Sequence, residues 1–173
     1  LGGLDRDTSS TTGSCNPDDI KPGLVSQGID IEAQMFPADD IVASFGVTYA
    51  DTRYAGNLVG SDDGTPLDAA LRELPGQRMS NAPEWTVTGS IGWTPPIGNT
   101  GLEGLFYIDA RMVDNYNTGS DLFPQKVQDS YVVVNARTGI RNIAGHFSIE
   151  LWAQNLFNQN YAQVLFNSPF QAV

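Results

Sequence analysis

Few side chains in this sequence have the type and spacing that catalysis needs. His146 is the only histidine and Cys15 the only cysteine among 173 residues. A histidine-based triad and a multi-histidine metal site both need further groups around the imidazole. A Cys15–His146 dyad is conceivable, but no nucleophile–base pair is visible in the pattern, so we expect that the protein is not an enzyme. Cys15 is either a free thiol or the partner of a cysteine outside these residues.

Acidic side chains occur in adjacent pairs, which the chemistry of turns explains. The pairs are Asp18–Asp19, Asp39–Asp40 and Asp62–Asp63. Aspartate carboxylates accept hydrogen bonds from nearby backbone N–H groups and therefore favour turns. A calcium site built from Asp62, Asp63 and Asp68 is the alternative, although their spacing differs from that of an EF-hand loop. We expect no metal ion and no cofactor.

Four charged residues within predicted strands are the candidate site residues. They are Asp109, Arg111, Arg137 and Arg141. In a strand, successive side chains point to opposite faces, and these four fall on the face opposite the apolar residues. Such side chains could contact a substrate or a neighbouring domain. We favour ion pairs, either between strands or with that neighbouring domain, over contact with a substrate.

The charge balance excludes one large class of partners. Lysine and arginine number 9 against 20 aspartates and glutamates, a net charge of −11. Nucleic-acid-binding proteins carry a basic patch or stripe, so we expect no nucleic acid partner. The same acidity disfavours docking on an anionic inner leaflet. No apolar run approaches the roughly 18 residues of a transmembrane helix, whereas the strands of a membrane barrel leave only a weak hydropathy signal.

Alternation of apolar and polar residues with period two predicts about six strands. They cover residues 25–35, 41–56, 85–94, 104–113, 130–141 and 146–157. Short turns alternate with long connections at residues 57–84 and 117–129, and a helical turn is expected over residues 67–74. Outer-membrane barrels show this regular alternation, and soluble sandwiches do not. The expected fold is all-β, an antiparallel up-and-down segment of a transmembrane β-barrel with short periplasmic turns and long extracellular loops.

The apolar residues of successive strands form one face, and tryptophans mark its ends. Trp85 and Trp93 are separated by roughly 26 Å along one strand, or roughly 20 Å after a strand tilt near 40°. This spacing matches an apolar band between two aromatic girdles. Further aromatic residues near strand ends favour the same interpretation. They are Phe36, Tyr49, Tyr116, Tyr131, Phe147 and Phe157.

Six strands alone would leave two open edges. In hydrocarbon each unpaired backbone group costs several kcal/mol, and about ten such groups along an edge would outweigh the stability of a typical domain. We therefore expect these residues to be part of a larger closed barrel. The beginning of the sequence, LGGLDRDTSSTTGSC, has neither an initiator methionine nor an apolar signal segment, which favours a piece cut from a longer chain.

The stretch ELWAQNLFNQNYAQ, residues 150–163, resembles the C-terminal region of TonB-dependent outer-membrane receptors. In that family the penultimate strand ends in Asn-Leu-Phe, followed by a few polar residues and a tyrosine. The matching residues are Asn155, Leu156, Phe157 and Tyr161. Upstream, LPGQRMSNAPEWTVTGSIGW resembles the family's entry into a strand, and VTYADTRY and SYVVVNARTGIR resemble further strand segments. The resemblance spans about residues 25–165.

The resemblance implies a barrel of about 22 strands whose lumen is closed by an N-terminal plug domain. Such a receptor in the bacterial outer membrane imports a scarce nutrient, for example a ferric siderophore, cobalamin or a saccharide, driven by the inner-membrane TonB complex. The implied partners are outer-membrane lipid, the plug, TonB and the small-molecule nutrient, whose identity the sequence does not indicate. The plug and its TonB-contacting segment are not among these residues, so no energy-coupling residue is assigned.

The expected organisation follows from the same resemblance. Residues 1–24 would be an extracellular loop, partly disordered, and residues 25–165 the C-terminal barrel segment. Residues 166–173 would begin the last extracellular loop, with the final strand missing. Segments 57–84 and 117–129 would capture the ligand, because loops on a rigid scaffold are the usual place of recognition. Two alternatives stay open, a porin without a plug and a soluble β-sandwich that serves in adhesion or carbohydrate binding.

Overall fold

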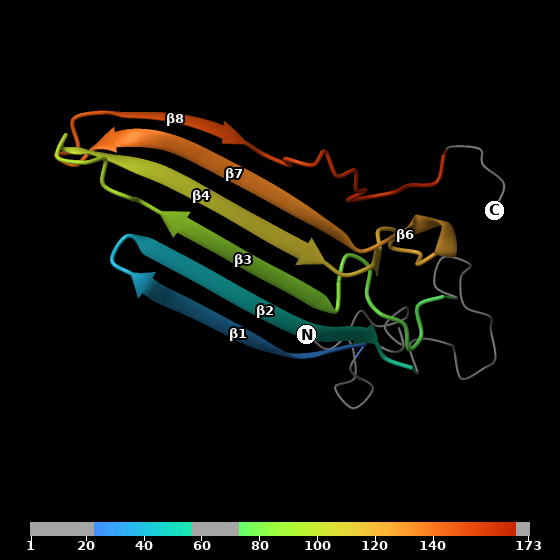
Figure 1. Cartoon of the computed structure of the whole chain (residues 1–173). Coiled ribbons are helices and arrows are strands. Elements are labelled where there is room, and N and C mark those ends of the chain that lie inside the picture. Colours follow the sequence, from blue (N-terminus) through green and yellow to red (C-terminus); the bar gives the residue numbers. More distant parts are fainter. Residues whose placement is uncertain (1–22, 57–72, 169–173) are drawn as a thin grey trace, which may run out of the picture.

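The computed structural model describes residues 23–56 and 73–168. Within them six antiparallel strands form one curved sheet in the order β1-β2-β3-β4-β7-β8 (Figure 1). The strands are β1 (Leu24–Ala38), β2 (Ile41–Tyr54), β3 (Trp85–Trp93), β4 (Leu102–Val113), β7 (Tyr131–Asn142) and β8 (Ser148–Ala153). The six predicted strands are confirmed. No helix in the described part of the chain is long and apolar enough to cross a membrane.

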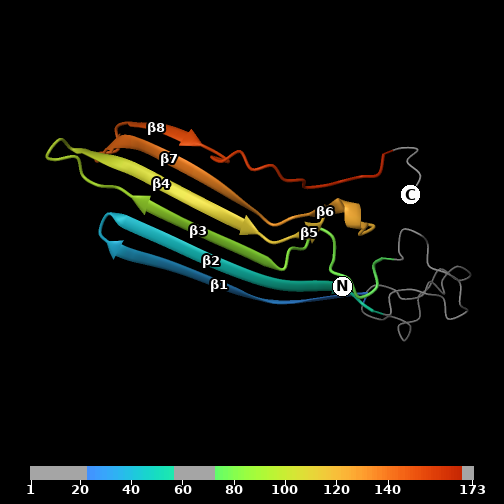
Figure 2. The ribbon, with the colours of Figure 1, turned by 45° about the vertical axis from the view of Figure 1, so that its right-hand side comes forward.

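The two ends of the sheet differ in the length of their connections. At one end, residues 39–40, 94–101 and 143–147 make short turns, and we call this the short-turn end (Figures 1 and 2). At the other end the chain leaves β2 and β4 into longer segments, which include residues 73–84 and 114–130. We call it the long-loop end. The predicted alternation of short and long connections is therefore present.

The pairing register separates the sheet into an apolar and a polar face. Partners that lie opposite each other on adjacent strands share a face. One row crosses all six strands with apolar side chains only, and its members are Met35, Ala43, Ile91, Ile108, Ala136 and Ala153. One residue further along, a row on the opposite face consists of Gln34, Ser44, Ser90, Asp109 and Asn135. The two faces predicted from alternation are confirmed.

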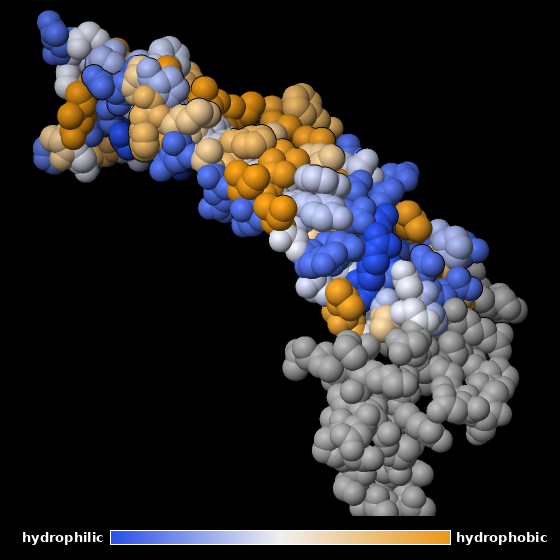
Figure 3. Space-filling model, turned by 90° about the horizontal axis from the view of Figure 1, so that it is seen from below, coloured by the Kyte–Doolittle hydropathy of each residue, from blue (hydrophilic) through white to orange (hydrophobic). Residues whose placement is uncertain are grey.

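Within the part of the chain that the structure describes, no second layer covers the apolar face. Ile29 is 65% exposed, Ile91 46% and Leu151 75%. In the space-filling view, hydrophobic side chains gather along the middle of the visible face, and hydrophilic ones predominate toward the grey atoms (Figure 3). Among the described residues, most buried side chains instead lie at the long-loop end, for example Leu74, Val113 and Tyr116. The sheet is therefore a wall, and the small core belongs to the loops.

Aromatic ring pairs mark both ends of the apolar face. Tyr49 lies 4.8 Å from Trp85, centroid to centroid, at the long-loop end, and Trp93 stacks on Phe106 at 5.2 Å near the short-turn end. The indole Nε1–H of Trp93 donates to the carboxylate of Asp40 at 2.8 Å. Aromatic rings with one polar edge suit a boundary between apolar and aqueous surroundings.

Two of the predicted girdle residues lie elsewhere. Tyr116 is buried, only 9% exposed, at the long-loop end. Tyr131 pairs with Val113 and so belongs to the polar face, where its ring stacks on Tyr161. A place near a strand end therefore does not by itself put an aromatic side chain on the apolar face, because alternation along the strand sets the face.

The connection between β4 and β7 is folded, whereas the sequence predicted a polar loop over residues 117–129. β5 (Tyr116–Asn117) and β6 (Val127–Gln128) pair with each other, and a 3₁₀ turn, Pro124–Lys126, links them. We call residues 114–130 the loop cap. The helical turn expected over residues 67–74 lies mostly outside the described residues. The residues of the possible calcium site and Cys15 lie entirely outside them.

Close contact between β7 and β8 generates the first prediction. A Cβ atom at Gly139 would lie 2.3 Å from the carbonyl oxygen of Ile149, whereas one at Gly89 would have no atom nearer than 3.8 Å. Gly139→Ala should therefore lower the free energy of unfolding by about 1–3 kcal/mol. Denaturant titration followed by tryptophan fluorescence measures the change, with Gly89→Ala as the control. Equal losses in both variants would contradict the close approach.

Candidate functional site

The four charged candidate residues all lie on the polar face, in β4 and β7. Three of them contact a neighbouring strand. Arg141 forms an ion pair with Glu103, and Arg137 lies 3.5 Å from the carboxylate of Glu150. The carboxylate of Asp109 accepts a hydrogen bond of 2.8 Å from the side-chain amide of Asn135. These contacts tie β4, β7 and β8 together across the polar face.

Arg111 differs from the other three because it makes no ion pair with a described residue. It lies toward the long-loop end of β4 and close enough to act electrostatically on Tyr131. The ring of Tyr131 stacks on Tyr161, with 4.3 Å between centroids and an interplanar angle of 6°. The hydroxyl of Tyr116 donates to the carbonyl oxygen of Ala162 at 3.2 Å. We call Arg111, Tyr116, Tyr131 and Tyr161 the tyrosine cluster.

The motif residue Asn155 joins the polar face to the segment that follows β8. Its backbone N–H donates to the Asn135 side chain at 3.0 Å, and Asn135 in turn binds Asp109. Its own side chain donates to the carbonyl oxygen of Gln159 at 3.0 Å and accepts from the Gln159 N–H at 2.8 Å. Asn155 has a φ of 49°, a backbone region that asparagine tolerates better than most residues.

The other motif residues have separate positions. The N–H of Leu156 donates to the carbonyl oxygen of Val134 at 2.8 Å, which continues the pairing beyond β8. The side chain of Phe157 is 73% exposed. Asn135 links a candidate site residue to the motif, and sequence reasoning did not single it out. Its polar character within an apolar strand, VVVNA, was the available signal.

The loop cap is held by a buried ion pair. Lys126 is 8% exposed, and its ammonium lies 2.5 Å from the carboxylate of Asp121. Burial of Asp121 raises its pKa, but the hydrogen bonds from Lys126 and the Phe123 N–H and the charge of Lys126 outweigh burial and hold the pKa below the ordinary value. The cap also closes on itself through Thr118, whose N–H and hydroxyl both donate to the Lys126 carbonyl.

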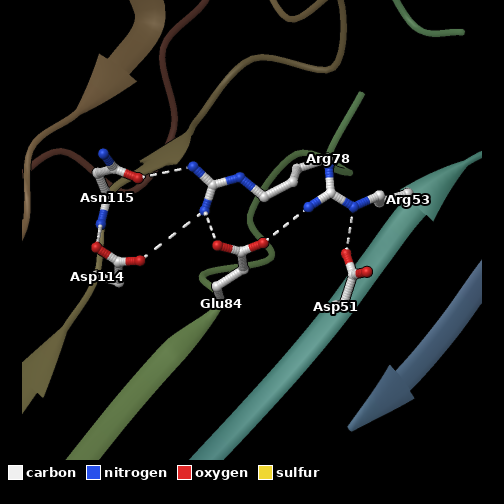
Figure 4. A network of polar contacts seen from close by, with 6 residues as sticks. All are labelled: Asp51, Arg53, Arg78, Glu84, Asp114 and Asn115. Atoms are coloured by element: carbon white, nitrogen blue, oxygen red, sulfur yellow. Dashed lines mark hydrogen bonds and ion pairs between the residues drawn. The ribbon is translucent and has the colours of Figure 1, made fainter. Parts of the chain in front are cut away.

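A second network of charges lies at the long-loop end, beside the start of β3 (Figure 4). Its members, which we call the rim network, are Asp51, Arg53, Arg78, Glu84, Asp114 and Asn115. Arg53 binds Asp51 at 2.5 Å and Glu84 at 2.9 Å. Arg78 donates to Asn115 at 2.8 Å and lies 3.4 Å from Glu84 and 3.9 Å from Asp114. The network therefore ties β2, the segment before β3 and the end of β4 together.

Two hollows lie near these groups. One, of about 820 Å³, lies along the polar face, where the small residues of β2 and β3 are bordered by Glu32 on β1 and by Asp109 and Arg111 on β4. The other, of about 440 Å³, opens between residues 73–82 and the loop cap, next to Arg78 and Tyr116. Within the described ranges no three His, Cys, Asp or Glu side chains gather into a metal-binding group.

Comparison with known proteins identifies the family. The family described as TonB dependent receptor-like, beta-barrel, matches residues 4–156. The chain belongs to this family. The resemblance found in the sequence is thereby confirmed, and TonB-dependent receptors are a family of receptors and transporters, not of enzymes. No curated protein sequence matches the chain.

A solved TonB-dependent receptor has the same fold. The ferric yersiniabactin uptake receptor FyuA from Yersinia pestis superposes with a TM-score of 0.66 at 13% sequence identity. The match covers 88% of this chain and 22% of FyuA, so the chain spans about a fifth of that receptor's length. The open sheet is thus similar to one section of a much larger receptor.

The two hydrogen bonds of the Asn155 side chain lead to a prediction. Asn155→Ala should lower the free energy of unfolding by about 1–3 kcal/mol more than Asn158→Ala does, because only Asn155→Ala removes the two side-chain hydrogen bonds to Gln159. Asn158 is the matched control, with a φ of 51° against 49° for Asn155. Hydrogen exchange at the Gln159 amide should become faster in Asn155→Ala alone. Equal exchange in the two variants would contradict this role of the motif.

The ion pair of the loop cap predicts a dependence on acid. The pKa of Asp121 in the folded cap lies below the ordinary 3.8, so the ionised carboxylate stabilises the cap fully at pH values above 3.8. This stabilisation is lost as the pH falls through the lowered pKa of the folded cap. Pepsin should therefore cut residues 116–128 faster at about pH 2 than at about pH 4, and Asp121→Asn should be cut fast at both. Asp129→Asn is the control. Cleavage of the wild-type cap at the same rate at both pH values would contradict the prediction.

Proposed function

We propose that this chain forms a C-terminal section of the barrel wall of a TonB-dependent receptor that imports a scarce nutrient across the bacterial outer membrane. The observation that carries the proposal is the continuous apolar face in register across six strands, which no second layer of described residues covers. A soluble protein would have to bury such a face. In a membrane barrel the lipid covers it, and the polar face lines the lumen.

The open edges support a larger assembly. Among the described strands, β1, with 15 residues, pairs only with β2, and β8 pairs only with β7. Free backbone groups along a strand are costly in hydrocarbon, so both edges must be paired by other strands of the barrel. Residues 1–24 would then belong to an extracellular loop and residues 166–173 to the last one, before a final strand that completes the wall.

The proposed orientation places the long-loop end outside the cell and the short turns in the periplasm. Barrels of the outer membrane carry long loops outside and tight turns inside. The loop cap is prefolded, so it offers a rigid surface to a ligand at small cost in conformational entropy. The plug domain of the full-length receptor would face Asp109, Arg137 and Arg141, and the TonB complex would act through that plug.

The tyrosine cluster is the proposed contribution of this section to ligand binding. It lies on the polar face at the long-loop end, where a ligand entering the lumen would pass. Arg111 offers a guanidinium that makes no ion pair with a described residue and lies beside stacked phenol rings, a combination that suits a ligand with an aromatic or anionic group. Among ferric siderophores, cobalamin and saccharides, the name of FyuA favours ferric complexes as the first class to test.

Growth tests the proposed function. A deletion strain should grow poorly when one defined source of iron, cobalamin or saccharide limits growth, and the full-length gene should restore growth only on that source. Restoration should require an intact TonB complex, because import is energy-dependent. Equal growth of both strains on every source would contradict the import function.

The tyrosine cluster gives a prediction at residue level. Arg111→Gln in the full-length receptor should weaken binding of the imported ligand about tenfold, the loss expected for one charged hydrogen bond. Isothermal titration measures the change. Arg141→Gln, which removes a polar-face arginine at the opposite end of the sheet, is the control and should bind normally. A tenfold loss in the control with none in Arg111→Gln would contradict the placement of the site.

A further inference from the structure

The rim network lies on the same side of the sheet as the apolar face. Side chains of alternate residues share a face, so Asp51 and Arg53 point the same way as Tyr49 on β2. The backbone of Arg78 forms an antiparallel bridge with Arg53, which places the two side chains on one face. The N–H of Asp114 donates to the carbonyl oxygen of Trp85 at 2.9 Å. The rim network therefore lies directly beyond the ring pair of Tyr49 and Trp85, which marks the end of the apolar face.

Within the rim network the cations are more exposed than the anions. The side chains of Arg53 and Arg78 are 45% and 32% exposed, respectively. The carboxylates are more covered, at 18% for Asp51, 23% for Glu84 and 26% for Asp114. A group that approaches from outside therefore meets guanidinium first, although the carboxylates outnumber the arginines by one.

Arg53 retains hydrogen-bonding capacity. Its Nε donates to Asp51 and one Nη to Glu84, while the other Nη bonds to no described residue. The two carboxylates hold the guanidinium in one orientation, so little side-chain entropy would be lost when a further acceptor binds. Guanidinium groups match the geometry of phosphate oxygens, and charge-assisted bonds of this kind are stronger than neutral ones.

We propose that the rim network is a docking site for the phosphate group of an anionic membrane lipid in the leaflet nearest the long-loop end, with Arg53 as the main contact. The inference rests on the proposed function, because it needs the apolar face to be embedded in lipid. A phosphate of the headgroup layer would then lie at the level of Arg53, directly beyond the aromatic pair. Only a lipid held in the membrane meets this site at high local concentration, which offsets the opposing charge of the carboxylates.

The expected binding is specific to position as well as to charge. The net charge of the chain is −11, so a general attraction to anions is excluded as the cause. A second arginine provides a matched comparison. Arg141 is 47% exposed beside a Glu103 that is 18% exposed, nearly the values of Arg53 and Asp51, but it lies on the polar face. If lipid binding depends on the face, only Arg53 should contribute.

Native mass spectrometry of the full-length receptor tests the proposal. The receptor is titrated with phosphatidylglycerol or phosphatidylcholine in neutral detergent, and bound lipids are counted. Arg53→Gln should weaken binding of phosphatidylglycerol about tenfold, and Arg53→Lys should weaken it less, because it keeps the charge but loses the fork of donors. Arg141→Gln should bind as the wild type does. Inorganic phosphate should not compete at concentrations that match the lipid.

Three results would overturn the proposal. They are wild-type binding by Arg53→Gln, an equal loss in Arg141→Gln, and competition by inorganic phosphate as effective as that by the lipid, which would indicate a site for the free ion. If Arg53→Gln does not fold, lipid binding by Arg53→Lys tests the proposal instead, because the lysine keeps a positive charge beside Asp51 and Glu84. Nutrient uptake measured in the same variants separates the two proposals, because lipid docking can fail while uptake stays normal.

Discussion

Backbone hydrogen bonding in an apolar medium is the constraint on which this structure depends. A strand that faces lipid cannot leave its N–H and C=O groups to water, so each strand must pair on both sides along its full length. β1, β2, β4 and β7 are long, and their registers run almost without interruption. The one irregularity in β1 lies at its short-turn end, between Met35 and Ala38. The same requirement explains why the sheet cannot end at β1 and β8.

The two faces of the wall use different physical means. On the apolar face, stability comes from contact with the surroundings rather than from a core, which is why Ile29 and Leu151 are exposed. On the polar face, cross-strand pairs such as Arg137–Glu150 and Asp109–Asn135 hold adjacent strands through charge and hydrogen bonds. We propose that recognition takes place at the long-loop end, where buried side chains hold the loop cap. A rigid wall and a prefolded cap would suit the proposed import function, which needs ligand binding without leakage through the membrane.

The sequence predicted the wall well and the loops poorly. Period-two alternation follows from strand geometry alone, so the six strands, their faces and the positions of Trp85 and Trp93 could be predicted. Tyr116 and Tyr131 were counted among the boundary aromatics because they lie near strand ends, but Tyr116 is buried, and Tyr131 lies on the polar face, where alternation also places it. The loop cap was missed because no pattern in the sequence marks its buried residues, such as Leu122 and Lys126. The link from Asp109 through Asn135 to Asn155 depends on the register of three strands, which only the structure gives.

Spin labels placed one at a time along β3 in the full-length receptor would show directly whether the apolar face of the sheet meets lipid. Each label reports its access to oxygen, which dissolves in lipid, and to a water-soluble nickel chelate. If the apolar face meets lipid, labels at residues 87, 89 and 91 are accessible to oxygen and protected from nickel, and labels at residues 86, 88 and 90 show no lipid exposure. Labels at residues 87, 89 and 91 that neither reagent reaches would mean that the apolar face packs against protein, and the account of a membrane wall would be contradicted.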